Sequence, residues 1–139
     1  MLIKLKASQK IKTVSPEDIH GILNQFLKAK HKFDREKEHF WTIGLTARNS
    51  IIYIDTVSIG CINGVITEAR EIFRFAILKG TVAIIVVHNH PSGNLKPSVA
   101  DERITNKLVK AGKIIGINVL DHLIITTQWY YSFKEQGRI

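Results

Sequence analysis

The stretch Val86-Val87-His88-Asn89-His90-Pro91-Ser92-Gly93-Asn94-Leu95-Lys96-Pro97-Ser98-Val99-Ala100-Asp101 decides the fold of this chain, because it joins a strand to a helix. The run 81–87 before the histidines is β-branched and apolar, which predicts a buried strand, and Ser98 opens an amphipathic helix. Residues two apart in a strand point the same way. His88 and His90 can therefore direct their imidazoles to one point.

Asp101 adds a carboxylate to these two imidazoles. It lies one turn into the predicted helix, from which its side chain can fold back toward His88 and His90. Two His and one carboxylate, with one position left for water, is typical of a catalytic zinc site. The run Ser98-Val99-Ala100-Asp101 also fits a capping box, and the two interpretations are compatible.

Two other metal-dependent classes fit less well. HNH nucleases place their ligands on a ββα metal finger, and the sequence offers no second ligand pair at the separation that such a finger requires. Cytidine deaminases need a pair of Cys ligands with a nearby Glu. Cys61 is the only cysteine of the chain, which excludes that pair and also thiolate zinc clusters.

The motif resembles that of a known family. His-x-His, seven residues and then Ser-x-x-Asp, with a Glu far upstream, is similar to the JAMM motif of JAB/MPN zinc metallopeptidases, and the form His88-Asn89-His90-Pro91-Ser92-Gly93 closely resembles the bacterial RadC branch. Other segments resemble RadC proteins in the same order, so that the likeness covers residues 15–135: Glu38-His39-Phe40-Trp41, Val57-Ser58-Ile59-Gly60, Ala69-Arg70-Glu71-Ile72-Phe73 and Leu120-Asp121-His122.

This resemblance implies a zinc metallopeptidase that hydrolyses a peptide or isopeptide bond of a protein or peptide substrate. The two histidines and Asp101 would hold Zn²⁺, which activates water for the attack. Glu38 would be the general base and then the general acid, with Glu36 as the alternative because the two lie close together. Ser98 would donate a hydrogen bond to the developing oxyanion.

Fold class follows from the order of the remaining elements. Helix, hairpin, helix, strand, helix and strands predict a three-layer α/β domain with a mixed, curved sheet flanked by helices, consistent with the JAB/MPN fold, which is similar to that of cytidine deaminases. We expect a basic arm or edge strand over 1–14 and one domain over 15–139.

Local signals bound the first predicted elements: Ser15-Pro16 starts a helix that ends near Lys30, 31–37 is a charged connection, and a hairpin runs from Glu38 to Ser58 through a turn at Arg48-Asn49. Thr67 caps the next helix, whose apolar stripe consists of Ala69, Ile72, Phe73, Ala76 and Ile77. The helix from Ser98 stops at Gly112 with a further turn to Ile115, and strands follow over 118–126, interrupted at Asp121-His122, and over 129–133.

His122 has two interpretations. It is either a partner that orients a metal-bound histidine from behind or a structural residue paired with neighbouring backbone, and we favour the second. Asp121 is expected at the surface. The aromatic residues Phe40, Trp41 and 129–131 either complete the core or form an exposed patch.

Charge leaves a second class of function open. The formal charge of +8 and the Lys residues concentrated in the first third of the chain favour weak, non-specific contact with nucleic acid. DNA repair or recombination, the traditional description of RadC proteins, is therefore the alternative to peptidase activity. The helix-hairpin-helix region of longer RadC proteins is missing from this sequence, which we expect to be a short form and which lowers the DNA hypothesis.

Location follows from the lack of a signal or membrane segment in the sequence. The apolar run at 83–87 is too short to span a bilayer and the N-terminus alternates Lys with apolar residues, so we expect a cytoplasmic protein. The sequence determines neither the substrate nor the oligomeric state.

Overall fold

The computed structural model of the protein describes residues 1–6, 14–60 and 68–139. Its helices are α1 (Pro16–Lys28), α2 (Lys32–Arg35), α3 (Ala69–Leu78) and α4 (Val99–Ile115), and its strands are β1 (His39–Leu45), β2 (Ile51–Ile59), β3 (Ala83–Asn89), β4 (Asn118–Ile125) and β5 (Tyr130–Ser132).

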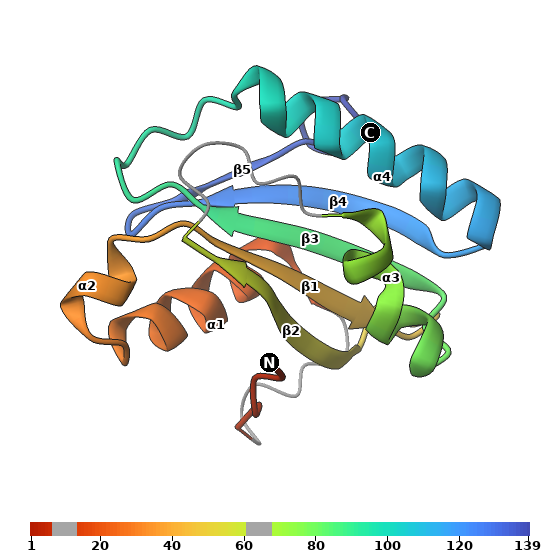
Figure 1. The fold of residues 1–139 in the computed structure, drawn as a ribbon, viewed down its shortest axis with the longest axis horizontal. Helices are drawn as coiled ribbons and strands as arrows, with labels where there is room; N and C mark the ends of the chain where they lie inside the picture. The colour runs from red at the N-terminus through yellow and green to blue at the C-terminus, as the bar shows by residue number, and fades with distance from the viewer. Residues whose placement is uncertain (7–13, 61–67) are drawn as a thin grey trace.

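The strands form one mixed sheet in the order β2-β1-β3-β4-β5. Among the strands of the described residues, β3 and β4 are the only parallel pair; β1 is antiparallel to β2 and to β3, and β5 is antiparallel to β4. Helices α1 and α2 lie on one side of the sheet and α3 and α4 on the other, which gives three layers (Figure 1). The α/β class and the mixed sheet flanked by helices are confirmed.

Strand β3 is buried on both faces and separates two apolar clusters. Ile85 and Val87 pack on the side of α1, whereas Ile84 and Val86 pack on the side of α3 and α4. Such a strand needs apolar residues at successive positions, not an alternation of apolar and polar ones. The continuous apolar run thus anchors β3 on both faces, and the two histidines lie at the end of this strand.

Local signals placed several elements correctly. Ser15 and Ser98 are the N-caps of α1 and α4, and each forms a capping box with the Asp three residues later. The β1–β2 hairpin turns at Asn49, which has a left-handed φ of 59°, a conformation that Asn tolerates better than most residues.

The helix stop predicted at Gly112 was wrong, whereas the further turn predicted to Ile115 is part of the same helix. Helix α4 continues to Ile115 and ends on Gly116, which has a left-handed φ of 74°. Gly112 is buried inside the helix, and a Cβ added to it would lie 2.4 Å from the carbonyl oxygen of Ile117. The glycine there allows the chain leaving α4 to fold closely back over the helix.

The structure also differs from the predictions at α2, at Ile77 of α3 and in β4. The charged connection contains the short helix α2, which buries no side chain. Ile77, predicted to be in the apolar stripe of α3, is 62% exposed, and the buried residues of α3 are Ile72, Phe73 and Ala76. Strand β4 runs unbroken through Asp121-His122, with its irregularity opposite the Ile84/Ile85 step of β3.

Some predictions lie wholly or partly outside the described residues. The cap at Thr67 is one of them; the structure assigns Glu68 as the N-cap of α3, without a side-chain cap. Of the basic arm over 1–14, the described part includes Leu2, which forms an isolated antiparallel bridge with Asp55. The described residues include no helix that is both long enough and apolar enough to cross a membrane.

Replacement of Gly112 by Ala should destabilise the protein by about 1–3 kcal/mol, since the added methyl group meets backbone that has no room to move. The matched control is Gly21→Ala in α1, where the new Cβ contacts nothing, and which should stabilise the helix by up to about 1 kcal/mol. Chemical denaturation of both variants measures this; equal effects would contradict the close-approach role of Gly112.

Candidate metal centre

The structure brings the side chains of His88, His90 and Asp101 together at the end of β3. The Nε2 atoms of the histidines are 3.0 Å apart, Asp101 Oδ1 lies 3.1 Å from His88 Nε2, and Asp101 Oδ2 lies 3.6 Å from His90 Nε2. Ligand atoms around a tetrahedral zinc ion, at 2.0–2.2 Å from it, are themselves about 3.3 Å apart. The donor set and its spacing therefore fit a metal ion.

Asp101 is both a helix-capping residue and a member of this cluster. Its Oδ2 accepts a hydrogen bond from the backbone N–H of Ser98 at 2.7 Å, and its own N–H donates to Ser98 Oγ at 3.1 Å. Burial raises the pKa of Asp101, but the two imidazoles outweigh burial and hold the pKa far below its usual range. The carboxylate is therefore ionised and available to a cation.

The orientation of His90 is set by its other nitrogen. Nδ1 lies 2.6 Å from the carbonyl oxygen of Asn94, which can only accept, so Nδ1 carries a proton and Nε2 faces the cluster. The pKa of His90 is raised chiefly by the Asp101 carboxylate, against burial, and the charge of Glu38 adds to the effect. Glu38 therefore lies close enough to act on the cluster.

Pairing of β1 with β3 explains why Glu38 is near. Phe40 pairs with His88 in the antiparallel register, so continuing that register by two residues puts Glu38 across from His90. Glu38 is half-buried, and its carbonyl oxygen accepts a hydrogen bond from Gly60 N–H at 2.8 Å. Glu36 is exposed at the C-cap of α2, two residues further than Glu38 from the start of β1.

Asn89, between the two histidines, faces the other way, and it ties the start of β1 to the end of β3. Its Oδ1 accepts from His39 N–H at 2.6 Å and its Nδ2 donates to the Lys37 carbonyl at 3.1 Å. These two bonds flank Glu38 in sequence. No role was predicted for Asn89, although its place in the strand indicated its direction.

His122 lies directly behind His88, so the interpretation favoured from the sequence was wrong. Its Nε2 is 2.8 Å from His88 Nδ1, and its Nδ1 is 2.6 Å from Thr105 Oγ1. Burial lowers the pKa of His122 well below its ordinary value, and the neighbouring His88 acts in the same direction, so the ring is neutral.

Asp121 is also buried, contrary to the prediction. It accepts hydrogen bonds from Ser132 Oγ at 2.5 Å, Lys134 N–H at 3.0 Å and His122 N–H at 2.7 Å. Burial is the main influence on the carboxyl and raises the pKa of Asp121. Asp121 thus joins β4 to β5 and the residues that follow it.

Three residues near the cluster were missed: Thr105, Phe40 and Phe133. Thr105 lies four residues after Asp101 on the same helix face, which was a usable signal. The ring of Phe40 stacks on that of His88 at a centroid distance of 5.9 Å, and the ring of Phe133 stacks on that of His122 at 4.9 Å. The positions of the two residues, in β1 and directly after β5, indicated only that they would be buried.

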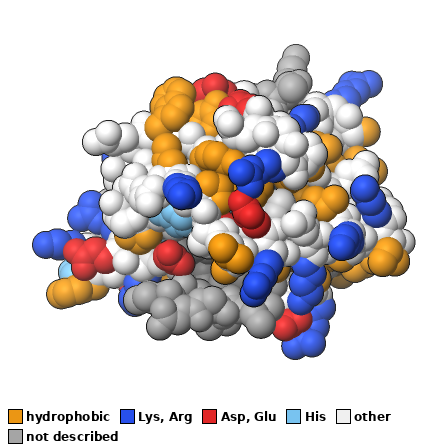
Figure 2. All heavy atoms as spheres, turned by 90° about the horizontal axis from the view of Figure 1, so that it is seen from above, with side chains coloured by type: hydrophobic (Ala, Val, Ile, Leu, Met, Phe, Trp, Pro, Cys, Tyr) orange, Lys and Arg blue, Asp and Glu red, His pale blue; other side chains and the backbone are white. Residues whose placement is uncertain are grey.

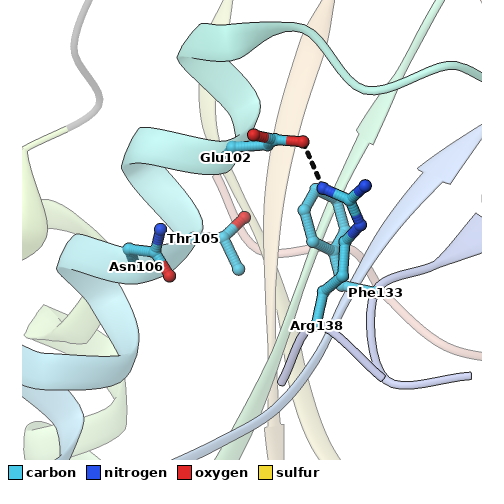
Figure 3. Close-up of a pocket in the computed structure, with 5 residues that line it drawn as sticks. All are labelled: Glu102, Thr105, Asn106, Phe133 and Arg138. Atoms are coloured by element: carbon cyan, nitrogen blue, oxygen red, sulfur yellow. Dashed lines mark hydrogen bonds and ion pairs between the residues drawn. The ribbon is translucent and has the colours of Figure 1, made fainter. Parts of the chain in front are cut away.

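A hollow lies near the cluster, and two of the residues that line it, Thr105 and Phe133, also contact His122. Figure 3 shows it between α4 and the C-terminal residues, with the ion pair between Glu102 and Arg138 across it. Glu102, Thr105, Asn106, Phe133 and Arg138 line it. His88, His90 and Asp101 are not among its walls, so it is distinct from the candidate metal centre.

Comparison with known proteins places the chain. The model of the RadC-like JAB domain matches residues 13–138. The chain belongs to this family. Proteins named UPF0758 protein are similar to it: one from Methanosarcina acetivorans is 40% identical over 92% of this chain and 54% of its own length, and one from Alkaliphilus metalliredigens is 44% identical over 88% of this chain and 51% of its own length.

A third relative, from Desulforamulus reducens, is 38% identical over 99% of this chain and 59% of its own length. The chain thus spans little more than half the length of the curated relatives that it matches. Within this RadC-like JAB domain, the His88, His90 and Asp101 cluster fits a JAMM-like metal site.

Replacement of Asn89 by Ala should lower the free energy of unfolding of this RadC-like domain by about 1–3 kcal/mol, because it leaves the buried His39 N–H without a partner and removes one of the two hydrogen bonds to the Lys37 carbonyl, the other coming from His39 Nδ1. Asn118→Ala, at an exposed position of β4, is the control. Urea titrations of the two variants provide the comparison, and an Asn89→Ala protein as stable as the control would exclude a clamping role.

Proposed function

We propose that this protein is a zinc-dependent hydrolase of the JAMM type that cleaves a peptide or isopeptide bond. The observation that carries the proposal is that three possible metal ligands lie together, while a fourth ionisable side chain, that of Glu38, lies nearby without belonging to the cluster. His88, His90 and Asp101 lie within ligand spacing, and Glu38 lies across from His90 by strand register. A ligand set with a separate carboxylate is the arrangement that metal-assisted hydrolysis requires.

Exposure supports a catalytic site over a purely structural one. The side chain of His88 is 6% exposed, those of His90 and Asp101 are 13% and 15% exposed, and Ser98 is exposed. The cluster is therefore closed from behind and reachable from one side. Structural zinc sites have four protein ligands, whereas catalytic ones keep a position open for water or substrate.

In this proposal each residue has a distinct task. A bound zinc ion supplies Lewis acidity and lowers the pKa of water from about 15.7 toward about 7. The Glu38 carboxylate accepts the proton of the attacking water and returns it to the nitrogen of the leaving amine, so that Glu38 ends the cycle ionised. Its place directly before β1, with its carbonyl oxygen bonded to Gly60 N–H, holds Glu38 beside the cluster.

Ser98 would stabilise the carbonyl oxygen as negative charge develops on it. The Ser98 hydroxyl accepts a hydrogen bond from Asp101 N–H at 3.1 Å, which uses a lone pair and leaves its proton available to donate. Ser98 is exposed at the open side of the cluster. Loss of one such donor typically lowers kcat by about 10²–10³.

The test combines metal content with cleavage. The purified protein should take up one zinc ion per chain, as measured by elemental mass spectrometry, and Asp101→Ala should abolish the uptake. Glu38→Gln should keep the zinc yet lower cleavage of a panel of fluorogenic peptide and isopeptide substrates by about 10²–10⁴.

Glu36→Gln is the matched control, because it makes the same change two residues away at an exposed helix end. It should keep both zinc and activity. A protein that takes up no zinc, or one in which Glu38→Gln and Glu36→Gln are both as active as the parent, would refute the proposal; loss of activity in Glu36→Gln alone would assign the base to Glu36.

A second candidate function is weak binding of nucleic acid, and one observation favours it. Arg103, Lys107, Lys110 and Lys113 are exposed along one side of α4. Figure 2 views the molecule from the side that carries α4 and shows Lys and Arg side chains distributed over it. Such a basic surface attracts phosphates without reading sequence.

For this candidate, the double variant Lys110→Ala and Lys113→Ala should bind a DNA duplex more weakly, and the slope of log K against log salt should fall by about 0.9 for each phosphate that the protein no longer neutralises. The matched control, Lys28→Ala and Lys32→Ala, removes the same charge from the first third of the chain. Fluorescence anisotropy over a salt series distinguishes the two surfaces; an unchanged slope in both variants would contradict the candidate.

A further inference from the structure

His122 is enclosed by the candidate metal centre on one side and by α4 on the other. It lies on β4, next to Val86 of β3, and is fully buried. Its ring is stacked on Phe133 at 4.9 Å with an interplanar angle of 9°, and Phe40 contacts it at 5.8 Å. These aromatic contacts thus fix the plane of the imidazole ring.

Both ring nitrogens of His122 are hydrogen-bonded inside the protein. Nε2 lies 2.8 Å from His88 Nδ1, and Nδ1 lies 2.6 Å from Thr105 Oγ1. Thr105 Oγ1 is in turn 2.6 Å from the carbonyl oxygen of Asp101. A continuous chain of hydrogen bonds therefore runs from the backbone of one candidate ligand, Asp101, to the side chain of another, His88.

The protons in this chain can be ordered in one way. A carbonyl oxygen only accepts, and a hydroxyl has a single proton, so Thr105 must donate to Asp101. Thr105 Oγ1 can then only accept from His122, which places a proton on His122 Nδ1. The ring is fully buried and neither of its nitrogens faces a carboxylate, so it carries a single proton; with that proton on Nδ1, Nε2 must accept from His88 Nδ1–H.

This order determines which nitrogen His88 offers to a metal. With the proton on Nδ1, the lone pair of Nε2 faces His90 and Asp101. The opposite order would place the proton on Nε2, where it would exclude a metal. Metal-binding histidines usually donate to a carboxylate, a carbonyl or water; here the acceptor is a second, uncharged imidazole.

We propose that Thr105 and His122 are positioning residues that fix the tautomer of His88 and so prepare the metal site in advance of binding. The proposal rests on the proposed zinc site for its purpose, but the proton order can be measured without metal. Neither residue touches the open side of the cluster, so neither is expected to contact substrate.

The first test is direct observation of the tautomers by long-range ¹H–¹⁵N NMR of the imidazole rings. His122 should carry its proton on Nδ1 in both metal-free and zinc-loaded protein, and zinc-loaded His88 should carry its proton on Nδ1. A proton on His122 Nε2 in the metal-free protein overturns the inference. This result is independent of the proposed function, which fails separately if no zinc binds.

The second test is zinc affinity measured against a chromophoric chelator. Thr105→Val removes the hydroxyl at nearly constant volume and should weaken zinc binding by about 10–100-fold, the usual effect of losing an outer partner. Thr105→Ser retains the hydroxyl and should restore the affinity of the parent. Retained secondary structure in each variant excludes simple unfolding as the cause.

Thr42→Val is the matched control, since Thr42 is 1% exposed on β1 and its hydroxyl has no hydrogen-bond partner within the described part of the chain. Its zinc affinity should equal that of the parent. If Thr105→Val binds zinc as tightly as the parent and as Thr42→Val, the positioning role is wrong.

Discussion

The capping box at the start of α4 is the interaction on which the candidate site depends. Asp101 must accept the Ser98 N–H for the helix to begin where it does, and the same carboxylate contacts the imidazoles of His88 and His90. An acidic residue in the first turn is stabilised by the helix dipole as well. The start of the helix and the position of the third candidate ligand are therefore determined by the same hydrogen bonds of Asp101.

The sheet supplies the other half of the geometry. Because β3 is antiparallel to β1 and parallel to β4, one strand end receives Glu38 from one neighbour and His122 from the other. Its burial on both faces means that neither neighbour can shift without opening an apolar cluster. The rigid strand β3 thus places its histidines next to Glu38 and His122, and functional sites need such rigid support to keep their geometry.

What could be predicted from the sequence was local or periodic. The two Ser-x-x-Asp caps and the apolar run before His88 can each be recognised within a few residues, and so can the cluster of His88, His90 and Asp101. The failures involve contacts between distant segments. Asp121 is buried because Ser132 and Lys134 satisfy it, His122 is explained by Thr105 seventeen residues earlier, and Gly112 by the returning backbone at Ile117. No periodicity in the sequence indicates such partners. Buried polar residues are where single-sequence reasoning is weakest, since their pairing is decided only by the fold.

The two sides of the cluster differ in a way that bears on its chemistry. Behind His88, the hydrogen bonds through His122 and Thr105 are buried and fully paired, and aromatic rings cover them. In front, Ser98 and the edges of His90 and Asp101 reach solvent. A paired rear resists rearrangement, whereas the accessible front is where the proposed function places water and the substrate carbonyl. Rigid ligands with one open approach are what separates a hydrolytic metal centre from a structural one.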